Sequence, residues 1–114
     1  MKRKIIAVDF DGTLYTDDYP DIGDPIWRTI NYCKKEKENG AILILWTCRI
    51  GQDLVEAVEL CERIGLTFDY VNENAKENIR AFGGRDNRKI YADEYIDDKA
   101  INVSDLPQEP YNGF

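Results

Sequence analysis

Two carboxylates stand directly after the first apolar run of the chain, in the segment AVDFDGTLY at residues 7–15. Asp9 and Asp11 are separated by one residue and are followed at once by Gly12 and Thr13. Two carboxylates about 4 Å apart repel each other by about 4 kcal/mol at an effective dielectric constant near 20, so they need a cation or a proton. This spacing therefore predicts metal binding or catalysis by carboxylates, with a solvated turn after a strand as the alternative.

A second group of acidic side chains lies near the end of the chain. The two groups comprise Asp9, Asp11, Asp17, Asp18, Asp21 and Asp24 in the first quarter, and Asp93, Glu94, Asp97 and Asp98 later. Either group could be plain solvated surface. Together they could instead hold Mg²⁺, which prefers a few carboxylates plus water and substrate phosphate oxygens.

The composition narrows the classes of chemistry. The 114 residues include no histidine, so a zinc site of the usual kind and a histidine-dependent triad are not expected. General acid–base catalysis would therefore depend on carboxylates. The net charge of −7 disfavours a nonspecific nucleic-acid binder, which normally has a basic face.

The sequence also indicates a compartment. Its three cysteines, Cys33, Cys48 and Cys61, show no CxxC spacing and are read as free thiols in a reducing cytoplasm. The apolar run after the basic start is too short for a signal peptide, and no stretch has transmembrane length. We expect a cytoplasmic protein of one domain, residues 1–114, with no membrane partner.

Apolar segments alternate with segments of helical periodicity. The predicted strands are Ile5–Val8, 41–46, 68–71 and one or two short ones within 89–92 and 95–97. Three helices are predicted. The first has Asp24 as its N-cap and Pro25 at its first helical position, the second begins at Asp53, and the third covers 75–82. We read 16–24 as a polar loop and the tail from about 102 as irregular.

This alternation predicts an α/β fold with a central parallel sheet. In such sheets, ligands bind at the carboxyl ends of the strands. The polar residues that end predicted strands are Asp9, Asp11, Thr47, Asp97 and Asp98. We therefore expect these side chains to meet at one edge.

The same residues carry a resemblance to a known family. Asp9-Phe10-Asp11-Gly12-Thr13 resembles the DxDGT motif of the haloacid-dehalogenase-like hydrolase superfamily. ILILWT, ending at Thr47, and YIDD, ending at Asp98, resemble its later motifs in the family's order. The resemblance spans residues 5–98 and implies a three-layer sandwich with a Rossmann-like core.

The resemblance also implies roles for these side chains. Asp9 would be the nucleophile that forms an aspartyl-phosphate, and Asp11 the acid and base whose backbone carbonyl also binds Mg²⁺. Thr47 would bind a phosphoryl oxygen. Asp97 would be a direct metal ligand and Asp98 a second or water-mediated one, which gives a metal set of Asp9, Asp11, Asp97 and Asp98.

Other positions near these motifs have two readings each. The resemblance to the deoxyribonucleotidase branch implies that Lys89 is the phosphate-binding, catalytic lysine. Lys76, at the separation common elsewhere in the superfamily, is the alternative. Arg49 and Cys48 lie next to Thr47 and are candidates for substrate binding, although a surface ion pair would also explain Arg49. Asp93 is read as a turn residue.

Many members of the superfamily insert a cap domain. Here only 33 residues separate Thr13 from Thr47, enough for a loop, one helix and one strand. The resemblance is therefore to a capless phosphatase that acts on a small phosphomonoester, with a second copy or a bulky substrate able to cover the site. The alternative functions are a catalytically idle metal- or phosphate-binding regulatory module of the same fold, and phosphoryl transfer to an acceptor other than water.

Overall fold

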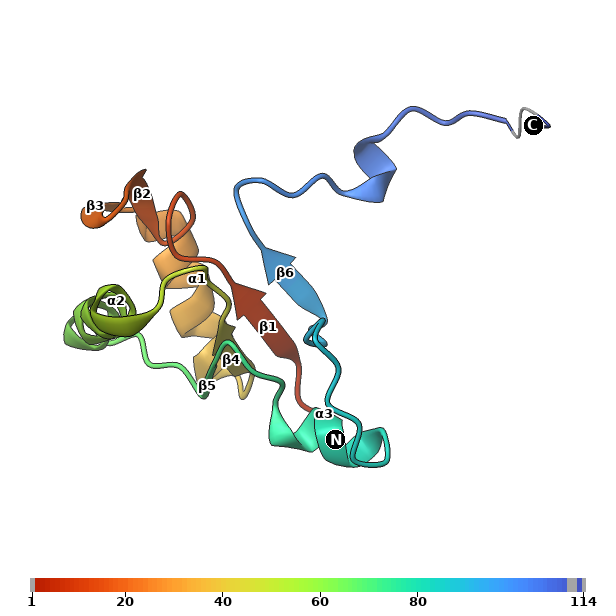
Figure 1. Ribbon diagram of the computed structural model, residues 1–114, viewed down its shortest axis with the longest axis horizontal. Helices are drawn as coiled ribbons and strands as arrows, with labels where there is room; N and C mark the ends of the chain where they lie inside the picture. The colour runs from red at the N-terminus through yellow and green to blue at the C-terminus, as the bar shows by residue number, and fades with distance from the viewer. Residues whose placement is uncertain (1, 111–112, 114) are drawn as a thin grey trace.

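Four parallel strands form the central sheet of the computed structural model, which describes residues 2–110 and 113 (Figure 1). In spatial order they are β5 (Tyr70–Val71), β4 (Ile42–Leu45), β1 (Ile5–Val8) and β6 (Glu94–Ile96). Val8 pairs with Leu45 on one side and with Ile96 on the other. The predicted α/β fold with a central parallel sheet is confirmed, and the register ends β1, β4 and β6 at the same edge.

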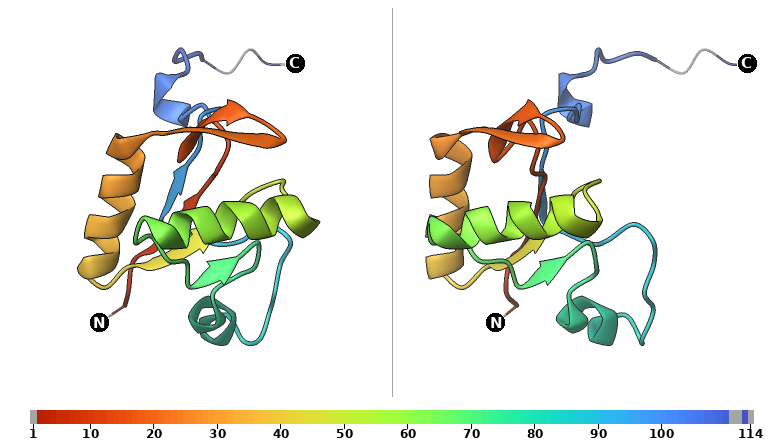
Figure 2. Two further views of the ribbon diagram at one scale, coloured as in Figure 1. Left: turned by 90° about the vertical axis from the view of Figure 1, so that its left-hand side faces the viewer. Right: turned by 60° about the vertical axis from the view of Figure 1, so that its left-hand side comes forward.

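Two helices, α1 (Trp27–Glu38) and α2 (Gly51–Arg63), lie on one face of the sheet (Figure 2). Each helix buries two residues against the strands, Ile30 and Cys33 from α1 and Ala57 and Cys61 from α2. They pack against buried side chains of the strands and loops, which include Ile6, Val8, Phe10, Leu14, Leu43 and Leu45. Both buried cysteines are free thiols, as expected.

The other face has a thinner cover. A short helix, α3 (Lys76–Ala81), and the segment after it supply this layer. The buried residues here are Ile5, Ala7, Ile42, Ile44, Ala75, Ile90 and Ala92. Residues 89–92 are predicted as a strand but do not form one, because side chains take up their backbone hydrogen bonds. The Tyr95 hydroxyl donates to the Ile90 carbonyl and accepts from the Ala92 N–H, and Asn74 Oδ1 accepts from the Tyr91 N–H.

The segment predicted as a polar loop is a β-hairpin, formed by β2 (Tyr15–Asp18) and β3 (Asp21–Pro25). Thr16 Oγ1 accepts a hydrogen bond from the backbone N–H of Asp24, 2.8 Å away. Asp24 is therefore part of a strand and does not cap a helix. The helix begins at Trp27, after Ile26, whose side chain makes no capping hydrogen bond.

The C-terminal segment runs away from the sheet beyond β6 (Figure 1). It contains one turn of 3₁₀ helix at Val103–Asp105, which Asn102 caps by accepting a hydrogen bond from the Ser104 N–H. The irregular tail predicted from about 102 includes residues 111, 112 and 114, which lie outside the described residues. Within the described part of the chain, every helix is too short or too polar to cross a bilayer.

Candidate metal and phosphate site

Three carboxylates meet at the carboxyl edge of the sheet. Asp9 follows β1, and Asp97 and Asp98 follow β6. Each side chain offers one oxygen, and these oxygens lie within 4.8 Å of one another. The backbone N–H of Asp9 donates to the Ile96 carbonyl at 2.9 Å, which extends the pairing of β1 with β6 up to the cluster.

The electrostatics of this cluster favour a cation or a proton. The pKa of Asp9 is raised from 3.8 to about 6, first by burial and then by the charges of Asp97 and Asp98. Oxygen ligands of one octahedral Mg²⁺ are each about 2.1 Å from the ion, so adjacent ligands are about 3 Å apart and opposite ligands about 4 Å apart. The three carboxylate oxygens, within 4.8 Å of one another, are near these spacings, and the all-oxygen donor set suits this hard ion.

Gly12 leaves room for the cluster. Its φ of +85° lies in the left-handed region, where a side chain is strained. A methyl group built on Gly12 would also overlap the carboxylate of Asp98. The glycine after Asp11 therefore allows both the sharp turn and the close approach of a residue 86 positions later in the chain.

A cavity of about 480 Å³ opens over the cluster and also reaches the hairpin. Its lining residues are Asp9, Asp11, Asp17, Tyr19, Thr47, Cys48, Arg49, Asp97 and Lys99. Thr47 is held by two hydrogen bonds, since its N–H donates to Asn72 Oδ1 at 2.8 Å and its Oγ1 accepts from the Arg49 N–H at 3.1 Å. Its hydroxyl proton stays available for a ligand in the cavity.

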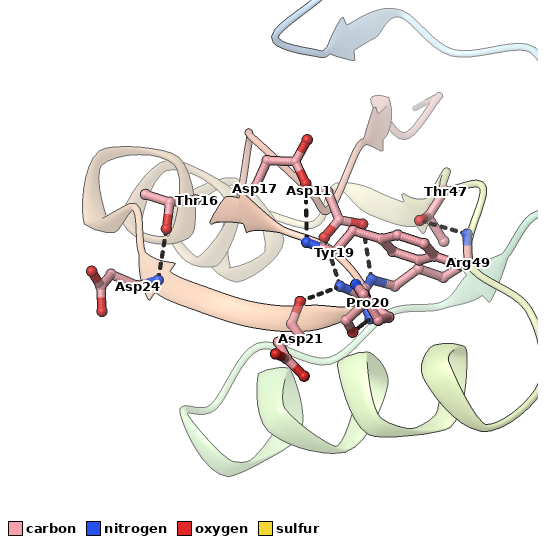
Figure 3. Close-up of polar contacts among 9 residues, drawn as sticks. All are labelled: Asp11, Thr16, Asp17, Tyr19, Pro20, Asp21, Asp24, Thr47 and Arg49. Carbon is pink, nitrogen blue, oxygen red and sulfur yellow. Dashed lines mark hydrogen bonds and ion pairs between the residues drawn. The ribbon is translucent and has the colours of Figure 1, made fainter.

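Arg49 is buried, with 1% of its side chain exposed, so the surface ion pair considered for it is wrong. Its Nε and Nη2 donate to the two carboxylate oxygens of Asp11 at 2.8 and 2.7 Å (Figure 3). Such a bidentate pair is geometrically specific. The Asp11 carboxylate is therefore engaged by Arg49 and lies outside the cluster of Asp9, Asp97 and Asp98, so the predicted metal contact of Asp11 stays with its backbone carbonyl.

Arg49 also ties the hairpin to the sheet. Its Nη1 donates to the Pro20 carbonyl at 3.0 Å, and its Nη2 donates to the Asp21 carbonyl at 2.8 Å (Figure 3). The guanidinium lies 5.0 Å from the Phe10 ring centroid and 5.1 Å from that of Tyr19. Four hydrogen bonds and two aromatic contacts offset the cost of burying this charge.

Lys99 lines the acidic cavity, although no sequence motif pointed to it. Its backbone N–H donates to Asp97 Oδ1 at 2.7 Å. Lys89 lies elsewhere, with its Nζ 5.7 Å from the Tyr95 ring centroid, and it lines a different cavity. Lys76 is the exposed first residue of α3. Neither residue is among those that line the acidic cavity.

Two further residues of the site went unnoticed in the sequence. Asn72, whose φ is +54°, bonds to Thr47, and asparagine is one of the few residues that tolerate this conformation. Tyr19 lines the cavity from the hairpin, within the segment that the sequence predicted as a polar loop. Cys48 does line the cavity, as an exposed free thiol. Asp93 instead joins the start of β1 to β6, because its Oδ2 accepts from the Ile5 N–H at 2.7 Å.

Comparison with known proteins places the chain beside one solved structure, that of a conserved protein from Bacteroides thetaiotaomicron. The two sequences are 38% identical over 94% of this chain and 84% of that chain, and the structures agree with a TM-score of 0.75. No family model matches the sequence, and no curated protein matches it.

Replacing Asp9 with Asn is expected to stabilise the metal-free protein near pH 7.5 by about 1 kcal/mol. The raised pKa means that wild type loses stability as the pH rises from about 4 through about 6, when Asp9 ionises in the folded state. Urea denaturation in EDTA at pH 4 and 7.5 measures this, with Asp18→Asn on the exposed hairpin as the matched control. A difference between Asp9→Asn and wild type that is the same at both pH values would contradict the expectation.

Replacing Arg49 with Lys is expected to cost roughly 2–4 kcal/mol of unfolding free energy, because an ammonium cannot make the bidentate pair and two carbonyl bonds. Arg28→Lys on the exposed side of α1 is the control and should change stability by less than about 0.5 kcal/mol. Equal urea midpoints for the two variants would show that the Arg49 contacts contribute little.

Proposed function

The chain belongs to the same family as the conserved protein from Bacteroides thetaiotaomicron, and we propose that it is a Mg²⁺-dependent phosphomonoester hydrolase. The observation that carries the proposal is the convergence of Asp9, Asp97 and Asp98 beside Thr47, at the edge of the sheet where ligands of such folds bind. The resemblance of these motifs to those of haloacid-dehalogenase-like hydrolases supports the same reaction. In this proposal the sheet is a Rossmann-like core of that type without a cap.

Asp9 is the proposed nucleophile. A carboxylate oxygen of Asp9 attacks phosphorus, the bond from phosphorus to the leaving oxygen breaks, and the alcohol departs with a proton from an acid. Water then attacks the aspartyl-phosphate, gives its proton to the same group as a base, and releases phosphate with Asp9 restored. Asp9 is partly exposed in the cavity, and Thr13 Oγ1 lies 3.4 Å from its Oδ2, which supports its orientation.

A divalent cation would overcome the main obstacle to this reaction. The cavity has several carboxylates and repels a phosphate anion in the absence of a cation. Asp9, Asp97 and Asp98 would hold Mg²⁺, with the Asp11 carbonyl as a further ligand that the resemblance implies. When bound, Mg²⁺ supplies positive charge that offsets the charge of the phosphoryl group. Thr47 donates its hydroxyl proton to a phosphoryl oxygen.

Asp11 is the proposed acid and base, and it must change partner to act. Both of its oxygens accept hydrogen bonds from Arg49 in the structure, so neither is available to carry a proton to a leaving group there. Rotation of the Asp11 side chain away from Arg49 would free it. We propose that the arrangement described is a resting state and that substrate binding favours the rotated one.

The same contact favours one alternative function. If Asp11 stays on Arg49, the domain can bind a metal and phosphate but lacks an acid for the leaving group. It would then act as a catalytically idle regulatory module. The presence of Asp9 in a partly buried cavity beside Thr47 makes the hydrolase the better-supported function.

Hydrolysis of p-nitrophenyl phosphate is expected with Mg²⁺ and absent in EDTA. Asp9→Asn removes the nucleophile and should lower kcat by at least about 10³-fold. Asp18→Asn, on the β2–β3 hairpin but outside the cavity lining, should retain wild-type kcat. Saturable Mg²⁺ binding by calorimetry without turnover in any variant would instead support the idle module.

Lys99→Ala is expected to lower kcat/KM by about tenfold or more, because one charge-assisted contact to the phosphoryl group is lost. Lys89→Ala should remain within about twofold of wild type, because Lys89 lines another cavity. Steady-state kinetics of the two variants, measured side by side, test this. The opposite ranking would identify Lys89 as the phosphate-binding lysine and would require its segment to move toward Asp9.

A further inference from the structure

A second cavity, of about 530 Å³, lies between α3, the segment after it and β6. Its lining residues are Asn78, Phe82, Arg85, Asn87, Lys89, Ile90, Tyr91, Ala92 and Tyr95. None of them lines the acidic cavity. The volume is within the range of sites that hold small organic ligands.

The charge of this region is opposite to that of the whole chain. Residues 76–91 contain five basic and two acidic side chains, in a protein with a net charge of −7. Two of the basic residues, Arg85 and Lys89, stand in the cavity wall. Among the described residues, neither makes an ion pair within 4.0 Å. A guanidinium and an ammonium free for a ligand predict an anionic group.

The aromatic rings of the same wall are incompletely buried. Phe82 is 53% exposed and Tyr95 is 43% exposed. The rings of Phe82 and Tyr91 are tilted by 40° with their centroids 6.4 Å apart, and Lys89 lies over the Tyr95 ring. The exposed Phe82 ring beside Tyr91 offers an apolar face on which a planar group can stack, whereas the Tyr95 ring already has Lys89 over it.

The cavity wall is held in place although it has no regular secondary structure. Asn74, 2% exposed, donates from Nδ2 to Asp86 Oδ1 at 2.9 Å and to the Asn87 carbonyl at 3.0 Å, and its Oδ1 accepts from the Tyr91 N–H. The Tyr95 hydroxyl donates to the Ile90 carbonyl at 2.6 Å. Asn74 thereby fixes both ends of residues 86–91, which hold Lys89 and Tyr91 and directly follow Arg85. A segment held in position before a ligand arrives lowers the entropic cost of binding.

We infer that this second cavity binds a small planar ligand with an anionic group, and that a nucleoside monophosphate is the class that fits it. The base would stack on the exposed ring of Phe82, beside Tyr91, and the phosphate would bind Arg85 and Lys89. Lys89, which the sequence pattern predicted as the phosphate-binding lysine of the catalytic site, would instead bind the phosphate of a ligand in this second cavity. This inference does not depend on the proposed hydrolase activity.

Titration of the isotope-labelled protein with AMP in EDTA, followed by NMR, tests the inference. Without Mg²⁺ the acidic cavity repels phosphate and hydrolysis is absent, so binding reports on the second cavity. The expected result is saturable shifts in residues 78–95, with AMP binding at least tenfold more tightly than adenosine or inorganic phosphate alone. Shifts confined to residues 9–19, 47–49 and 97–99, or no saturable binding, would overturn the inference. Failure here would leave the hydrolase assay unaffected.

Variants separate the two parts of the ligand. Lys89→Ala and Arg85→Ala should each weaken AMP binding by about fivefold to tenfold and leave adenosine binding unchanged. Phe82→Leu should weaken the binding of both ligands. Arg88→Ala removes an exposed cation of the same segment that does not line the cavity, and it should bind AMP like wild type. Equal losses for Arg88→Ala and Lys89→Ala would show general attraction to a basic surface and would overturn the site.

Discussion

The repulsion among Asp9, Asp97 and Asp98 is the constraint around which the carboxyl edge of this sheet is arranged. Parallel pairing of β1 with both neighbours ends the strands in register, which brings the acids that follow β1 and β6 to one edge. Gly12 removes the Cβ that would push Asp98 away. The folded chain therefore brings like charges together, and partial burial together with Asp97 and Asp98 raises the pKa of Asp9. Such strain is typical of sites whose ligand supplies the missing charge.

Arg49 meets a different requirement. An acid next to the cluster would add to the repulsion, and the bidentate contact with Arg49 balances the charge of Asp11 inside the fold. Because the same guanidinium binds two carbonyls of the β2–β3 hairpin, the position of the hairpin and the state of Asp11 are linked through one side chain. The hairpin reaches over the acidic cavity, where Asp17 and Tyr19 form part of the cavity wall.

The two cavities divide the chemistry of the protein by charge. The acidic one is at the carboxyl edge of the sheet, and the basic, aromatic one is beside α3 and the segment held by Asn74. Tyr95 and Asp97 stand only two residues apart in the sequence yet line different cavities. Because two oppositely charged regions lie in one small domain, the net charge of −7 describes neither cavity by itself.

The sequence by itself determined the apolar strands, the two long helices and the acids that end β1 and β6, because these depend on local periodicity and on strand ends. The hairpin at 15–25 was missed since its pairing relies on Thr16 and on the contacts of Arg49, which join residues far apart in the chain. For the same reason, only the tertiary structure decided that Asp11 contacts Arg49, that Asn72 positions Thr47, and that Lys99 lines the acidic cavity while Lys89 lines the other. A motif specifies which residues are available, but the direction of each side chain depends on neighbours that no local pattern contains.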